Sequence, residues 1–388
     1  MLEWAEVLRE TYDVAVVVSV GAFIVGVLFG VATEISAYCT RSAVAEWVSP
    51  KGGHGLRSKT LMIAAAMLTA LGGTLALQMS SLIDLSEAIF WSNSIKPVGL
   101  VVGGLLFGVG MVLARGCISR LLVLSASGNM RALVTMLVIA IASYATMRGV
   151  LSYPRVALEE TWDTFVHPAD LFADESNLVI AAALIAMLLF ALMWRSVPSQ
   201  SLKTSVLPAL KPATAGLAIG SLVVAGWIVT GIVGADDFEP VPLAALSFTA
   251  PVAETVQYAM IFTGDSMRFG IALVLGTLVG AFASSVVSGR FGYQEFTADT
   301  PPVWQYVIGG MLMGFGGVTA LGCTVGQGLS GVATASPASV IAMVSIVAGA
   351  AGAMKLLAPR AAGAGQNAPS RTSKKSAPFV TGASQLQA

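Results

Sequence analysis

The sequence predicts an all-α membrane protein with about nine transmembrane helices, short re-entrant half-helices and two inverted-topology repeats. Three observations predict this architecture. Only 11% of the 388 residues are charged and 56% are hydrophobic, whereas a soluble domain is about 25% charged. Apolar stretches long enough to cross a bilayer recur along the chain. A glycine-rich motif that ends in cysteine occurs twice. The lipid bilayer is therefore the first partner that we expect, and no basic patch suggests a nucleic acid.

The apolar stretches fall into nine candidate segments. They lie near residues 12–33, 61–80, 97–114, 132–147, 177–194, 213–234, 269–287, 303–320 and 336–357. The first residues, MLEWAEVLRETYD, are acidic and lack the basic region of a cleaved signal peptide. From about Pro359 the chain is polar and rich in Ala, Ser, Gly and Lys, a composition typical of disorder.

The distribution of basic residues predicts the orientation. If all nine segments cross the bilayer and the N-terminus is outside, most of the 21 Lys and Arg residues fall in the inside segments. The positive-inside rule then predicts a periplasmic N-terminus and a cytoplasmic C-terminus.

The repeated motif predicts an internal duplication. Residues 103–117 read GGLLFGVGMVLARGC and residues 309–323 read GGMLMGFGGVTALGC, which agree at nine of fifteen positions. In the predicted topology the first copy runs inward and the second outward. Opposed copies of one motif are typical of transporters built from inverted repeats, with the substrate site near the bilayer midplane.

The repeat divides the chain into four parts. We expect a first repeat over residues 1–170, with four membrane segments, and a linker membrane segment over 171–209. A second repeat of four segments follows over 210–357, and a disordered cytoplasmic tail over 358–388.

Four of the segments carry a GxxxG motif, which lets helix backbones approach closely in lipid. The motifs are Gly26/Gly30, Gly104/Gly108, Gly276/Gly280 and Gly310/Gly314. Plain helix packing explains these eight glycines, and we expect the pair at 26 and 30 to correspond to the pair at 276 and 280 in the second repeat.

Gly116-Cys117 and Gly322-Cys323 predict a different feature. Each pair ends an apolar run and precedes a stretch too short to cross the bilayer. We expect a helix that breaks at the glycine and a half-helix that begins near the cysteine. The N-terminus of a half-helix suits an anion. Cys39 follows the first segment and has Gly289 at its repeat position. Ordinary burial is the alternative for any single cysteine.

Metal and haem sites find little support in the sequence. No cysteine pair has CxxC spacing, and the two histidines lie in loops on opposite predicted faces. Met111, Met311 and Met313 lie near the motif and leave a Cu(I) site as an alternative to core filling.

Four charged residues near the membrane segments either anchor the ends of these segments or have a functional role within the membrane. They are Glu34, Arg115, Arg120 and Arg268. Anchoring at segment ends is favoured for Arg268, and both roles stay open for Arg115 and Arg120. The polar Gln78 and Gln327 either line a path or bond across helices.

The motifs resemble those of the YeeE/YedE family of membrane proteins. The resemblance rests on GGLLFGVGMVLARGC, GGMLMGFGGVTALGCTVGQGLSG and the looser FGVATEISAYCTRSAV, and it covers roughly residues 15–357. It implies thiosulfate uptake across the bacterial inner membrane along a path lined by Cys39, Cys117 and Cys323, in company with a small cytosolic sulfur-carrier protein. Arg120 stands where the resemblance implies a small residue.

Together with the membrane architecture, this resemblance implies an inner-membrane importer of thiosulfate or a similar sulfur oxyanion, which supplies inorganic sulfur for assimilation. It predicts a path that includes Gly116 and Gly322 beside the three cysteines, no resident cofactor or metal, and no enzymatic activity. Two alternatives remain at this point: a membrane sulfurtransferase that relays sulfur as a cysteine persulfide, and a Cu(I) channel.

Overall fold

The protein is a bundle of helices whose long members are apolar over most of their length. The computed structural model describes residues 13–48, 57–92, 96–160, 175–197, 207–235, 241–295 and 301–364. Within these ranges there is no β-strand, and the only bridge of that type joins Asn129 to Gln294. The fold is therefore all-α, as the composition predicts.

The nine predicted segments correspond to nine helices. They are α2 (Val14–Ser36), α4 (Ser58–Met79), α6 (Pro97–Leu113), α8 (Met130–Arg148), α11 (Glu175–Ser196), α13 (Leu207–Ile228), α15 (Phe269–Val287), α16 (Val303–Thr319) and α17 (Pro337–Ala364). Eight stretches in the described residues are long and apolar enough to span a bilayer. The segment without such a stretch is α16, whose 17 residues extend about 25 Å.

Shorter elements connect these helices. They are α3 (Thr40–Val48), η2 (Leu85–Glu87), α5 (Ile89–Ser92), α7 (Ile118–Ala126), α9 (Ser152–Glu160), η3 (Val229–Val233), α14 (Thr249–Met260), η4 (Phe262–Gly264) and η5 (Gly326–Gly331). Of these, α3 and α7 directly follow Cys39 and Cys117, and η5 begins three residues after Cys323. α17 continues to Ala364, so the first residues of the predicted tail are helical, and the rest of that tail lies outside the described residues.

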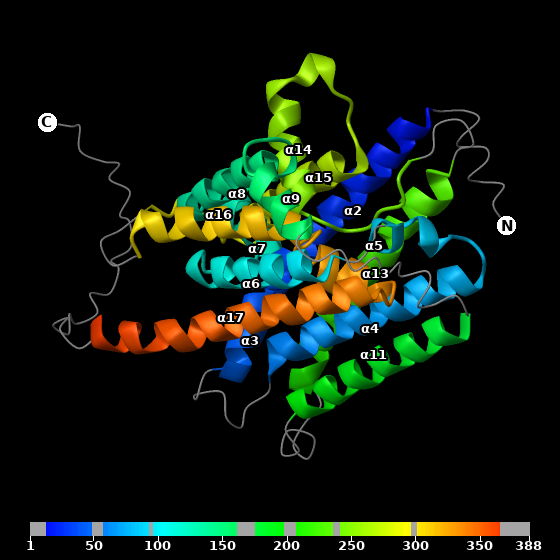
Figure 1. Ribbon diagram of the computed structural model, residues 1–388, viewed down its shortest axis with the longest axis horizontal. Coiled ribbons are helices and arrows are strands. Elements are labelled where there is room, and N and C mark those ends of the chain that lie inside the picture. Colours follow the sequence, from blue (N-terminus) through cyan, green and yellow to red (C-terminus); the bar gives the residue numbers. More distant parts are fainter. Residues whose placement is uncertain are drawn as a thin grey trace, which may run out of the picture.

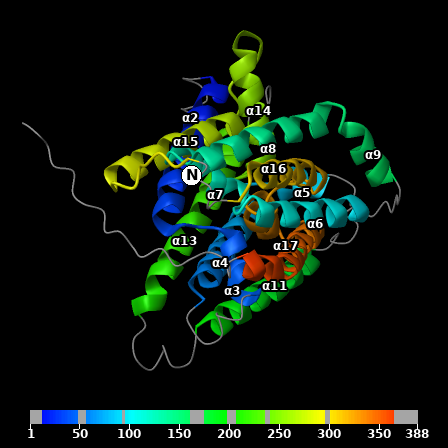
Figure 2. The same ribbon diagram turned by 90° about the vertical axis from the view of Figure 1, so that its left-hand side faces the viewer.

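The long helices pack in pairs that join distant parts of the sequence (Figures 1 and 2). The most extensive pairs are α2 with α15, α6 with α17, α4 with α13, α6 with α16 and α8 with α16. α11 lies against α4 at the edge of the bundle, where Figure 1 shows the two helices side by side. The glycine-rich helices α6 and α16 therefore pack against each other, with α17 beside α6 and α8 beside α16.

The GxxxG glycines lie where these helices cross. A Cβ atom on Gly30 would collide with the Thr277 carbonyl of α15, and one on Gly280 would collide with the Val27 carbonyl of α2. Gly108 lies in the same way against Ile346 of α17. Backbone approach this close leaves no room for a side chain, which confirms the packing interpretation of these motifs.

Gly26/Gly30 and Gly276/Gly280 face each other in one crossing. A Cβ atom on Gly26 would meet the Gly276 Cα atom at 3.1 Å. The crossing of α4 and α13 uses another small pair, because Gly216 and Gly220 of α13 lie against the carbonyls of Met62 and Ala66 in α4.

Candidate functional site

The break after α6 is fixed by backbone hydrogen bonds. The Arg115 N–H donates to the Val112 carbonyl at 3.2 Å, and the Gly116 N–H donates to the Met111 carbonyl at 3.2 Å. Arg115 itself adopts the left-handed region, with φ of +60°. This is the Schellman pattern that ends many helices, here with arginine in the place that glycine usually takes. The chain turns sharply at Gly116, and α7 begins at Ile118, directly after Cys117.

The break after α16 has the same hydrogen bonds. The Leu321 N–H donates to Val318 at 3.1 Å and the Gly322 N–H donates to Gly317 at 2.8 Å. Leu321, which is 206 residues after Arg115, also has a left-handed φ, of +58°. The sequence repeat is therefore also a repeat of backbone geometry, and the helix breaks predicted at Gly116 and Gly322 are present.

Small residues are required in both turns because a later side chain fills the space beside them. A Cβ atom on Gly116 would lie 3.1 Å from the side chain of Leu121. On Gly322 it would lie 3.2 Å from Cγ of Gln327. A large side chain at either glycine would push the following short helix away from the break.

Cys39 occupies a third break of similar design. Ala37, two residues before it, has a left-handed φ of +51°, as Arg115 has before Cys117. The Lys59 ammonium group donates to the carbonyls of Ser36 and Ala37 at 2.8 and 3.1 Å and so satisfies the end of α2. Helix α3 begins at the residue after Cys39.

Each cysteine stands at the start of the helix that follows its break. Its carbonyl accepts the first helical hydrogen bond, from Ala43 at 3.3 Å, Leu121 at 2.9 Å or Gln327 at 2.7 Å. The first N–H groups of such a helix have no partner within the helix and carry partial positive charge. One such group bonds to a cysteine sulfur: the Gly326 N–H donates a hydrogen bond to Cys323 Sγ at 3.4 Å.

Two of the three thiols are in contact. Cys117 Sγ lies 3.8 Å from Cys39 Sγ and 3.3 Å from the Ser119 hydroxyl. All three cysteines are free thiols, buried in one continuous core cluster. The pairing of Cys39 with Cys117 was not predicted, because residues 78 apart in sequence show no spacing signal.

Arg120 has a structural partner next to this thiol pair. The Glu34 carboxylate is buried and lies 3.5 Å from the Arg120 guanidinium and 3.6 Å from that of Arg290. The carboxylate therefore joins α2 to α7 and to the segment that follows α15. Arg115, by contrast, is exposed at the break.

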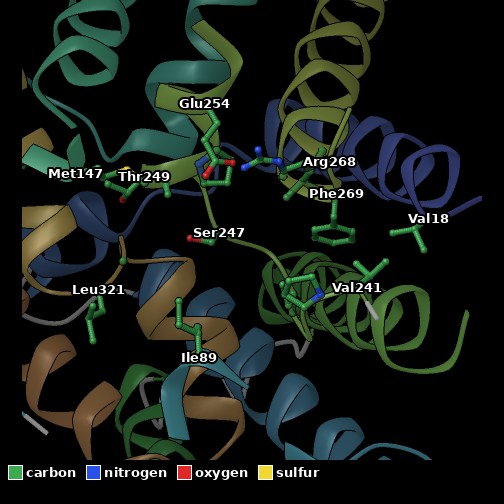
Figure 3. Close-up of a pocket in the computed structure, with 18 of the residues that line it drawn as sticks. Val18, Ile89, Met147, Val241, Ser247, Thr249, Glu254, Arg268, Phe269 and Leu321 are labelled. Atoms are coloured by element: carbon green, nitrogen blue, oxygen red, sulfur yellow. The ribbon is translucent and has the colours of Figure 1, made fainter. Parts of the chain in front are cut away.

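A cavity of about 1040 Å³ leads to the second break, and we call it the vestibule. Its walls come from the N-terminal ends of α2, α14 and α15, the C-terminal end of α8, the segment 241–247 and the break after α16. Leu321 and Gly322 form part of its lining, which brings the cavity to the residue before Cys323. Figure 3 shows Leu321 across the cavity from Glu254 and Arg268.

The vestibule carries more positive than negative side chains. Its lining contains Arg148, Arg155 and Arg268 but a single carboxylate, that of Glu254. Figure 3 shows the Arg268 guanidinium directed toward Glu254. Arg268, which the sequence predicted as an anchor, thus lines the cavity, and it also binds Asp265 at 3.2 Å.

The start of α14 adds polar groups to the same wall. Thr249 is the first residue of α14 and lines the vestibule, and its buried hydroxyl has no hydrogen-bond partner. A buried polar group of this kind calls for a partner that the protein itself does not supply. The sequence did not single out Arg148, Arg155 or Thr249, because only the fold brings α8, α9 and α14 to one cavity.

The two glutamines bond locally. Gln78 accepts a hydrogen bond from the Leu85 N–H at 3.0 Å. Gln327 donates to the Ala320 carbonyl at 2.9 Å and is buried against the break at Gly322. Its side-chain oxygen has no hydrogen-bond partner.

In the described part of the chain, no three His, Cys, Asp or Glu side chains gather closely enough to hold a metal ion. Met111 and Met313 are fully buried among core side chains, whereas Met311 is exposed. This arrangement favours core filling over a joint Cu(I) site for the three methionines.

Comparison with known proteins gives a consistent result. Residues 35–352 match the family described as sulphur transport. The thiosulfate transporter TsuA of Escherichia coli strain K12 is 26% identical over 79% of this chain and 85% of its own length. TsuA of Spirochaeta thermophila is also 26% identical, over 84% of this chain and 95% of its own length. A shorter probable transporter of Xylella fastidiosa is 33% identical over 20% of this chain and 56% of its own.

Proposed function

The chain belongs to the sulphur-transport family, and we propose that it imports thiosulfate along a path from the vestibule past Cys323 to the pair Cys117 and Cys39. One observation carries this path. All three cysteines begin a helix at a break, within one core cluster, and the vestibule ends at the glycine before Cys323. The alternatives of a sulfurtransferase and a Cu(I) channel have less support.

The chemistry of thiosulfate matches the groups along this path. Its sulfonate oxygens are hydrogen-bond acceptors, and its terminal sulfur is soft. Free N–H groups at helix starts stabilise an anion, and hydrogen bonds to a charged group contribute about 1.5–3 kcal/mol each. Thr324 adds a buried hydroxyl without a partner directly after Cys323. Because thiols are weak donors, they select for sulfur while the amides and hydroxyls stabilise the charge.

The proposed path needs two related halves, and the contact between α6 and α16 supports them. A Cβ atom on Gly103 would meet the Gly316 carbonyl at 2.9 Å, and one on Gly110 would meet the Gly309 carbonyl at 2.7 Å. In sequence, Gly103 corresponds to Gly309 and Gly110 to Gly316. Each helix therefore presents the same positions to the other, as a two-fold axis requires.

The flanking helices follow the same symmetry in our proposal. α6 packs on α17 as α16 packs on α8, and α2 packs on α15 as α13 packs on α4. This pairing relates α2 to α13, so the counterpart of Gly26/Gly30 is Gly216/Gly220. In this proposal the match of Gly26/Gly30 to Gly276/Gly280, and with it the match of Cys39 to Gly289, no longer holds, because Gly26/Gly30 contact Gly276/Gly280 directly.

The proposed orientation has the N-terminus in the periplasm, the C-terminus in the cytoplasm and the chain in the bacterial inner membrane. The vestibule then opens outward, because it is lined by the N-terminal ends of α2 and α15 and the C-terminal end of α8. An interior-negative potential opposes a dianion by about 4.6 kcal/mol per 100 mV. Consumption of thiosulfate inside, with a small cytosolic sulfur carrier as partner, would maintain the inward gradient.

Uptake of labelled thiosulfate into proteoliposomes that contain this protein alone tests the proposal. We expect uptake down an imposed thiosulfate gradient, competition by unlabelled thiosulfate, and no uptake by a Cys323→Ala protein present at the same density. Absence of uptake by correctly inserted wild-type protein would reject the proposed substrate.

A further inference from the structure

Cys39 and Cys117 form a buried dithiol at the junction of two helix breaks. Their sulfur atoms are 3.8 Å apart, whereas a disulfide bond is about 2.05 Å long. The sulfur atoms therefore need to approach each other by less than about 2 Å. Neither residue lies inside a helix, because Cys39 precedes α3 and Cys117 precedes α7. Side-chain rotation and a small shift of the two breaks can provide this approach.

Cys323 differs from the other two thiols in this respect. Its hydrogen-bonding contact is with the Gly326 N–H, and of the three cysteines, all of which lie in described residues, only Cys39 and Cys117 contact each other. Oxidation at Cys323 therefore has no neighbouring thiol to complete a disulfide. The same oxidant therefore gives a disulfide at Cys39 and Cys117 but not at Cys323.

Access to the dithiol is selective. Cys39 and Cys117 are 4% and 0% exposed, so a bulky oxidant does not reach them from solvent. If the path admits thiosulfate, which is the proposed function, it also presents these thiols to sulfur oxyanions that end in the same sulfonate groups. Tetrathionate is the oxidised dimer of thiosulfate, and its central S–S bond reacts with thiols.

We propose that Cys39 and Cys117 are a redox-sensitive modification site, converted to a disulfide by polythionates, and that this closes the transport path. One thiolate attacks a central sulfur of tetrathionate, forms a new S–S bond and expels thiosulfate. The second thiolate attacks the first cysteine sulfur and expels another thiosulfate. Two thiols and one tetrathionate thus give one disulfide, two thiosulfate ions and two protons, and thiol–disulfide exchange of this type proceeds by direct displacement.

The disulfide has two consequences for transport. It removes both thiol donors from the path. It also ties the break between α2 and α3 to the break between α6 and α7, so that the two segments no longer separate. Uptake then stops when oxidised sulfur compounds reach the membrane and resumes when a reductant regenerates the thiols.

The test uses the wild-type protein in proteoliposomes, treated with tetrathionate, then denatured, blocked with N-ethylmaleimide and digested with trypsin. Cleavage after Arg115 and Arg120 releases residues 116–120, and cleavage after Arg9 and Arg41 releases residues 10–41. We expect mass spectrometry to find most of the 116–120 peptide linked to residues 10–41, and dithiothreitol to separate them. Uptake should fall in proportion to the linked fraction and recover on reduction.

Two variants provide matched controls. Cys323→Ser should still form the link, whereas Cys39→Ser should leave Cys117 free or as a reducible thiosulfate adduct. An unlinked 116–120 peptide in treated wild-type protein that transports thiosulfate would overturn the inference and leave the proposed function intact. A link between the peptides of Cys117 and Cys323 would also overturn it. The peptide readout needs no transport, so a linked peptide without thiosulfate uptake would count against the proposed function alone.

Discussion

The two helix breaks that end at Cys117 and Cys323 share a backbone and differ in chemistry. Both have the same pair of terminal hydrogen bonds and a left-handed residue two positions before the cysteine. Beside Cys117 lies a second thiol, whereas Cys323 receives a backbone N–H and adjoins the vestibule. The two copies of the motif thus share one backbone geometry and place different groups beside the cysteine.

The residue three positions after each cysteine also differs between the two breaks. Arg120 and Gly326 are 206 residues apart and hold the same place, three residues after the cysteine. At Gly326 a Cβ atom would lie 2.7 Å from the Ser247 hydroxyl of the vestibule wall. The Arg120 side chain instead reaches the Glu34 carboxylate at 3.5 Å. Gly326 is therefore packed against the vestibule wall, whereas Arg120 is held by an ion pair.

The largest effect is expected from filling the turns that both breaks share. Gly322→Leu and Gly116→Leu should abolish thiosulfate uptake while the protein still inserts, because the new side chain collides with Gln327 or Leu121. Uptake in proteoliposomes, normalised to the amount of folded protein from size-exclusion chromatography, measures this. Gly72→Leu is the control, since a side chain at Gly72 meets nothing within 4 Å. Normal uptake by Gly322→Leu would show that the turn is not needed for passage.

The fold and the site differed in how far the sequence could predict them. Apolar length predicted the positions of the long helices, and the motif at Gly116 and Gly322 predicted both breaks, because these features are local. The contact of Cys39 with Cys117 and the partner of Arg120 depend on the packing of helices distant in sequence. Arg148 and Arg155 of the vestibule were not predicted for the same reason. Arg268 was predicted at the end of a segment, but the cavity that it lines was not predicted.

The next largest effect separates passage of an ion from relay of a sulfur atom. In passage, Cys117→Ala and Cys323→Ala should eliminate uptake, and Cys→Ser at either position should retain a few per cent, because the hydroxyl keeps a donor and loses the soft sulfur. In a persulfide relay, Ser and Ala should be equally inactive.

Intact mass spectrometry of wild-type protein after exposure to thiosulfate is a second measurement that distinguishes passage from relay. Passage predicts an unchanged mass. A reducible gain of about one sulfur atom would favour the sulfurtransferase, and its position, Cys323 or the pair Cys39 and Cys117, would show which break performs the chemistry.

A moderate effect is expected in the vestibule, which adjoins only the Cys323 break. Arg148→Gln combined with Arg268→Gln should raise the KM for thiosulfate roughly two- to tenfold and leave the maximal rate nearly unchanged, because these charges concentrate the dianion at the cavity. The change should shrink at high salt, where exposed charges are screened. Arg195→Gln on α11, outside the vestibule lining, is the matched control. A fall in maximal rate at unchanged KM would instead place the two arginines in the translocation step.

The smallest effect on transport is expected from the ion pair that distinguishes the Cys117 break. Glu34→Gln keeps the shape of the side chain and removes the charge that lies between Arg120 and Arg290. A buried charge that loses its partner is destabilising, although Arg290 is half exposed and part of its contribution is screened.

We therefore expect a melting temperature a few degrees lower in detergent and a modest loss of uptake. Arg120→Gly, which copies the residue at position 326, should weaken the protein in the same direction, and adding Glu34→Gln to it should cost less than the sum of the two separate changes. Fully additive losses would show that Glu34 and Arg120 act independently, and that the Cys117 break is held by packing, as the Cys323 break is.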